Sequence, residues 1–128
     1  MRERILYEYA TIRVVPKVER EEFLNVGIIL FSKSEKYIKF EYLLNRDRLV
    51  SFAKDLDVDL IEQALHSYQK IAAGEETGGD IAALEIPERF RWLTAVRSAC
   101  VQTSRPHSGL THNLDYTFNK LFEEMVLE

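Results

Sequence analysis

The chain has 128 residues, of which 46% are hydrophobic and 30% are charged, so it has the apolar content of one folded domain and is not of the disordered class. Its net charge of −4 comes from 17 basic and 21 acidic side chains without a polybasic block, which disfavours binding to nucleic acid or to an anionic membrane. The single cysteine, Cys100, excludes an internal disulfide framework and a metal site made of several thiolates.

The distribution of apolar residues also bears on location. The first apolar run, from Ile5 to Val15, is interrupted by Glu8 and Arg13, and no later run reaches the roughly 18 apolar residues that a membrane span needs. We therefore expect a cytoplasmic protein that consists of one domain over residues 1–128.

Three strands are predicted at the start of the chain. Residues 5–15 are mostly β-branched or aromatic, and Pro16 ends this strand because proline cannot donate to a ladder. Residues 26–31 form an uninterrupted apolar run, which is typical of a central strand buried on both faces. Residues 37–43 alternate between apolar and polar side chains. The pattern predicts a three-stranded antiparallel meander with the second strand in its middle.

Helices are predicted to follow. Asn45 can cap a short helix that ends near Lys54, and Asp57 can cap a longer one that ends at Gly74. Residues 75–80 are expected to form a surface loop, and Pro87 begins a third helix.

The last third of the chain adds one strand and one helix. Residues 98–103 alternate as a fourth strand, residues 105–112 are expected to form a loop around Pro106 and Gly109, and Asn113 caps the last helix. The predicted fold class is therefore α+β, a mainly antiparallel sheet with about four helices packed on it.

A group of polar residues in the last third of the chain is the candidate binding patch. A regular fourth strand would place Ser98, Gln102 and Ser104 on one face, with Arg97 just before it and His107 in the loop after it. Arginine, amide and hydroxyl donors together can bind a carboxylate, a phosphate or a partner loop. The competing interpretation, which the sequence favours, is an ordinary solvated strand face.

Arg13 is a second candidate because a strand buried on both faces seldom holds an unpaired guanidinium. We predict a structural ion pair with a carboxylate of the connection from Glu19 to Glu22 or of the sheet rim; the alternative is an arginine that binds a ligand. Asn25 lies at the end of that connection and joins this candidate group.

No recognised catalytic motif is present. Phosphate loops, nucleophile elbows and metal-binding motifs are absent from the sequence. His107 and Ser108 are adjacent, so in an extended segment they would point apart and could not act as base and nucleophile. A metal site of Cys100, His107 and His112 lacks a defined fourth ligand and spacing, and we predict neither a metal nor a cofactor.

Two stretches resemble an uncharacterised bacterial family, domain of unknown function 3037. The first runs from Tyr7 to Pro16 and continues from Glu19 to Phe31. The second runs from Arg89 to Ser98 and continues through four further positions, which are Gln102, Ser104, His107 and Gly109-Leu110. The resemblance implies no catalytic residue, because the family carries no established activity. It implies that the family-like polar positions are Arg13, Glu19, Asn25, Arg97, Ser98, Gln102 and His107, and that such proteins are often encoded beside a HipA-type kinase.

These observations favour a small protein-interaction or regulatory module over an enzyme. The resemblance implies a protein partner, with a HipA-type kinase as the leading candidate in a toxin–antitoxin-like context. The alternative is a small enzyme or anion-binding protein that uses the patch of Arg97, Ser98, Gln102, Ser104 and His107. A nucleic-acid-associated protein comes third because of the acidic charge.

Overall fold

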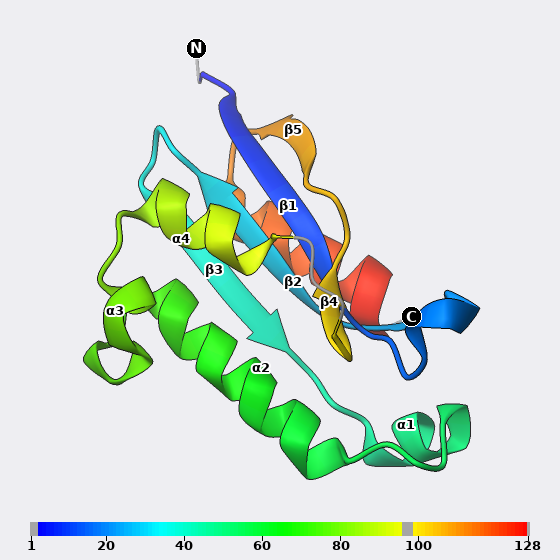
Figure 1. The fold of residues 1–128 in the computed structure, drawn as a ribbon. Coiled ribbons are helices and arrows are strands. Elements are labelled where there is room, and N and C mark those ends of the chain that lie inside the picture. The colour runs from blue at the N-terminus through cyan, green and yellow to red at the C-terminus, as the bar shows by residue number, and fades with distance from the viewer. Residues whose placement is uncertain (1–2, 96–98, 128) are drawn as a thin grey trace.

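The computed structural model describes residues 3–95 and 99–127, and its centre is one antiparallel sheet (Figure 1). The strand order is β3-β2-β1-β4, and β5 also pairs with β1. The predicted N-terminal meander is confirmed, since β2 lies between β1 and β3. The strands are β1 (Ile5–Val14), β2 (Leu24–Ser32), β3 (Tyr37–Tyr42), β4 (Val101–Thr103) and β5 (His107–Thr111).

Five α-helices are described where about four were expected. The additional one is the short α3, which with a preceding 3₁₀ turn replaces the loop predicted at residues 75–80. Within the described residues, no helix is both long and apolar enough to cross a membrane. The helices are α1 (Arg46–Phe52), α2 (Val58–Ala73), α3 (Gly79–Ala82), α4 (Ile86–Leu93) and α5 (Leu114–Phe122); η1 (Val18–Arg20) and η2 (Glu76–Gly78) are 3₁₀ turns, and η3 (Glu123–Leu127) is a π-helical turn.

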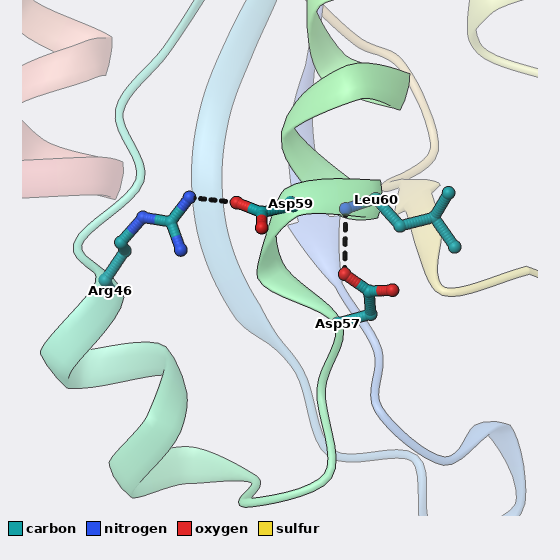
Figure 2. Close-up of polar contacts among 4 residues, drawn as sticks. All are labelled: Arg46, Asp57, Asp59 and Leu60. Atoms are coloured by element: carbon teal, nitrogen blue, oxygen red, sulfur yellow. Dashed lines mark hydrogen bonds and ion pairs between the residues drawn. The ribbon is translucent and has the colours of Figure 1, made fainter.

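The predicted caps set the ends of the helices. Asp57 Oδ1 accepts a hydrogen bond from the Leu60 amide at 3.1 Å, and Gly74 ends α2 in the left-handed conformation with φ of 71°. Asn45 and Asn113 cap α1 and α5 in the same way. Figure 2 shows the Asp57 cap beside an ion pair between Arg46 and Asp59, which joins the start of α1 to the first turn of α2.

Each face of the sheet has its own hydrophobic core, and we call these face A and face B. On face A, α2 and α4 cover the strands, and Phe31 stacks on Phe90 with ring centroids 4.8 Å apart. On face B, α5 and η3 pack on β2, and the Tyr37 hydroxyl donates to Asp115 at 2.7 Å. Burial is the main cause that raises the pKa of Tyr37, and the hydrogen bond to Asp115 is the second cause. The fully buried residues include Ala10, Ile12, Val14 and Ile29 on face A, and Ile28, Leu30 and Phe118 on face B.

A β-bulge interrupts the pairing of β1 with β2. Ile12 pairs with Gly27 but Arg13 pairs with Asn25, so Val26 is the extra residue. Val26 then packs into the core of face A, and Asn25 lies on the same face as Arg13. The bulge therefore determines which side chains of β2 reach face B.

The prediction of a loop over residues 105–112 was wrong, because residues 107–111 form β5. This strand pairs with the first half of β1, from Tyr9–His107 to Ile5–Thr111. A Cβ atom at Gly109 would collide with the Tyr7 ring, so this glycine lets an aromatic side chain cross the strand. The fourth strand is also shorter than predicted, since β4 starts at Val101.

Replacing Ile29 by alanine is expected to lower the free energy of unfolding by about 2–5 kcal/mol, because Ile29 is fully buried in the middle of β2 and the change leaves a cavity. Leu60→Ala is the matched control, since Leu60 is 62% exposed on α2. Urea denaturation measures both variants. Equal midpoints for the two would show that face A is not the main core.

Candidate functional site

Three of the predicted site residues lie side by side on face B, and His107 lies on the same face farther along β1. Arg13 is paired with Asn25 of β2 on one side and with Gln102 of β4 on the other, and His107 is paired with Tyr9. Directly paired residues of neighbouring strands project to the same side of a sheet. The sheet therefore gathers Arg13, Asn25 and Gln102 around the second half of β1 and places His107 beside its first half. Arg97 and Ser98 lie outside the described residues.

Arg13 is held by an aromatic ring and one hydroxyl group. Its guanidinium carbon lies 3.8 Å from the centroid of the Phe23 ring, and its Nη2 donates to Thr11 Oγ1 at 3.3 Å. Its Nε is buried and has no hydrogen-bond partner among the residues that the structure describes. Burial lowers the pKa of the guanidinium, because a low-dielectric surrounding disfavours the charged form. Arg13 thus carries a charge that the protein compensates only in part.

The predicted ion pair of Arg13 is not formed in the part of the chain that the structure describes. There the ion pairs are Arg20–Glu22 and Arg46–Asp59. Glu22 forms its ion pair with Arg20, and Glu19 is exposed in η1. Arg13 contacts the face of the Phe23 ring where a carboxylate was expected. This contact is favourable because the face of an aromatic ring attracts a cation.

Asn25 is the second under-compensated residue of this group. Its side-chain Oδ1 lies directly across from Arg13 in the ladder and is buried without a hydrogen-bond partner in residues 3–95 and 99–127. Buried polar atoms are normally hydrogen-bonded, because an unpaired one costs about 1–3 kcal/mol. A donor on β1, Arg13 Nε, and an acceptor on β2, Asn25 Oδ1, therefore both lack hydrogen-bond partners among the described residues, and they belong to directly paired residues. We call Arg13, Phe23 and Asn25 the Arg13 site.

Gln102 and Ser104 use their donors within the chain. Gln102 Nε2 donates to the Ala99 carbonyl at 2.8 Å. Ser104 Oγ accepts from the Thr11 amide at 2.9 Å and donates to the Arg105 carbonyl at 3.0 Å. These contacts stabilise the junction between β4 and β5, so the expected row of free donors is largely occupied.

His107 and Cys100 show no catalytic arrangement. The His107 ring is exposed and lies 5.3 Å from the Tyr9 ring, centroid to centroid. Burial raises the pKa of the Cys100 thiol, which lowers its thiolate fraction. Over residues 3–95 and 99–127, no group of three histidine, cysteine or acidic side chains is placed to hold a metal ion.

A cavity of about 250 Å³ is lined by none of the three residues of the Arg13 site. It is formed between the β1–β2 connection and the end of α1. Its lining combines charged and apolar residues, and among them are Lys17, Arg20, Glu22, Phe52 and Leu56. None of the predicted site residues lines it.

The chain matches a family described as a protein of unknown function, DUF3037, over residues 9–126. It belongs to that family. No curated protein matches the chain, and no solved structure does. The matched span includes all three residues of the Arg13 site, whereas residues 5–8 of β1, which pair with β5, lie outside it.

Sequence reasoning found Arg13 and Asn25 but missed Phe23 and Thr11. Phe23 is a large apolar residue in a charged connection, and it is 44% exposed. Such a residue between Glu22 and the start of a strand is a signal for a surface contact, because the four residues before it are all charged. The bulge that brings Asn25 beside Arg13 has no comparable signal in the sequence.

Ser104→Ala is expected to lower the free energy of unfolding by about 1–3 kcal/mol, because it leaves the amide of the buried Thr11 without an acceptor. Ser108→Ala is the control, since Ser108 is exposed on the neighbouring strand and should change stability by less than about 0.5 kcal/mol. Chemical denaturation compares the two. A Ser104 variant as stable as the control would mean that the Thr11 amide finds another acceptor.

Proposed function

We propose that this chain is a small protein-interaction module that binds a carboxylate of its partner at the Arg13 site. The observation that carries the proposal is a pair of buried polar atoms without a hydrogen-bond partner among the described residues, Arg13 Nε and the side-chain Oδ1 of Asn25. A protein that keeps an under-compensated charge beside an unpaired acceptor carries a cost that a bound ligand can offset.

The chemistry of the site fits a peptide-like ligand. A guanidinium presents a planar fork of donors that matches a carboxylate, and the Phe23 ring fixes the plane of that fork. Asn25 supplies an acceptor for an N–H group, so a carboxylate next to an amide would satisfy both residues. Acidic side chains and chain termini of proteins carry this combination.

A HipA-type kinase is the partner that we propose, on the basis of the family resemblance. An enzymatic role for this chain has less support, because Gln102 and Ser104 are engaged in structural hydrogen bonds and His107 lies on an exposed strand. The site also lies outside the cavity between the β1–β2 connection and α1. A protein surface is therefore a better match to the site than a small substrate.

Arg13→Met is expected to leave the free energy of unfolding unchanged or to raise it. The variant keeps the apolar stem against Phe23 and removes a partly buried charge, and no carboxylate among the described residues loses its partner. Thermal and urea denaturation test this. A loss of about 3 kcal/mol or more would instead point to the structural ion pair.

The same variant should weaken binding to a HipA-type kinase, the proposed partner, by at least about tenfold, which corresponds to about 1.4 kcal/mol. Isothermal titration calorimetry with the two purified proteins measures the affinity. Arg48→Met, at an exposed position of α1, is the control for loss of positive charge and should bind as the wild type does. Equal affinities for both variants would show that the Arg13 site is not part of the interface. If the wild type does not bind, the kinase is not the partner.

A further inference from the structure

One edge of the sheet is open. Within the described part of the chain, β5 pairs with β1 on one side only, and in Figure 1 it lies at the margin of the sheet. Three of its residues, His107, Ser108 and Leu110, are exposed, and Leu110 is 53% exposed. Beside it on β1, Leu6 is 60% exposed and is paired directly with Leu110. An open strand edge thus lies next to an exposed apolar pair.

The hydrogen-bond pattern shows which backbone groups of β5 face outward. The Ser104 amide donates to the Thr11 carbonyl at 2.9 Å, and the Val15 amide donates to the Cys100 carbonyl at 2.6 Å, so the odd-numbered residues of β1 point toward β4 and β5. Alternation in an antiparallel ladder then makes Tyr9–His107, Tyr7–Gly109 and Ile5–Thr111 the hydrogen-bonded pairs. The N–H and C=O groups of Ser108 and Leu110 therefore point away from the sheet.

The opposite edge of the sheet is protected, which makes the open edge distinctive. There α2 lies along β3, and Gln69 Nε2 donates to the Phe40 carbonyl at 3.2 Å. β3 also carries the charged residues Lys39 and Glu41. Charges and covering elements are the usual means of preventing strand addition. β5 contains neither a charged residue nor a proline.

We propose that β5 pairs with β5 of a second copy of this chain, which joins two sheets into one across a two-fold axis. An antiparallel register centred on Gly109 places Ser108 of each copy opposite Leu110 of the other. This register uses every outward N–H and C=O group of the two residues. It also brings the two Leu110 side chains to diagonal positions on face A, within reach of each other.

The charge pattern favours a second copy as the occupant. A two-fold interface brings the same strand against itself, so any charge in it meets a like charge. In the register centred on Gly109, Arg105 faces Asn113 and His107 faces Thr111, and no like charges face each other. Because β5 has only five residues, the interface is small, and the dimer should form in a concentration-dependent way.

The test is analytical ultracentrifugation of the full chain over a wide range of protein concentration. The wild type is expected to shift from monomer to dimer. Ser108→Pro removes an outward N–H group and no hydrogen bond to β1, so it should raise the dimer dissociation constant by at least about tenfold while the chain stays folded. Ser108→Ala keeps the N–H group and should dimerise as the wild type does.

A second pair of variants tests the side chains. Leu110→Lys places two positive charges at the diagonal positions and should also weaken the dimer, whereas Leu60→Lys, on the exposed side of α2, should not. Circular dichroism checks that each variant is folded. A wild type that is monomeric at every concentration overturns the proposal, and so does a dimer that neither Ser108→Pro nor Leu110→Lys weakens.

Discussion

The pairing of β1 with β2 is the interaction on which the rest of the structure depends. Both strands carry apolar side chains on their two faces, so most of each face must be covered from water. The chain meets this constraint by placing α2 and α4 on face A and α5 with η3 on face B. The helices cover the middle of the sheet, and the parts that they leave open are the Arg13 site and the edge of β5.

The bulge at Val26 explains how a continuous apolar run serves two cores and a polar site. In a regular strand a shift by one residue exchanges the faces of all side chains that follow. The extra residue in β2 does this locally, so Leu24 and Val26 pack into face A while Ile28 and Leu30 pack into face B. The same shift sets Asn25 beside Arg13. The polar site is thus a consequence of the way in which the strand is packed.

Several polar residues that attract attention in the sequence stabilise the backbone. Ser104 and Gln102 bind amide and carbonyl groups near the β4–β5 junction, where the ladder to β1 is interrupted. Side-chain hydrogen bonds of this kind are common where regular pairing ends, because every buried backbone group needs a partner. Arg13 and Asn25 differ from them because each retains a buried atom without a partner. This difference separates the candidate site from its polar surroundings.

The sequence by itself determined the elements whose signals are local. These signals depend only on neighbouring residues. They are the apolar patterns of the strands at residues 5–15 and 26–31, the helix caps at Asn45, Asp57 and Asn113, and the helix end at Gly74. It also indicated Arg13, because a charge within an apolar strand stands out. Local patterns of this kind are sufficient for the α+β fold class and for the central place of β2.

Only the tertiary structure decided what depends on residues far apart in the chain. Pro106 and Gly109 favour a loop locally, yet residues 107–111 form a strand because the edge of β1 offers them backbone partners. Likewise Arg13 was expected beside a carboxylate, but it lies on the ring of Phe23. The physical reason is that strand register, and with it the neighbours of each side chain, is set by packing across the sheet, which the local sequence pattern does not contain.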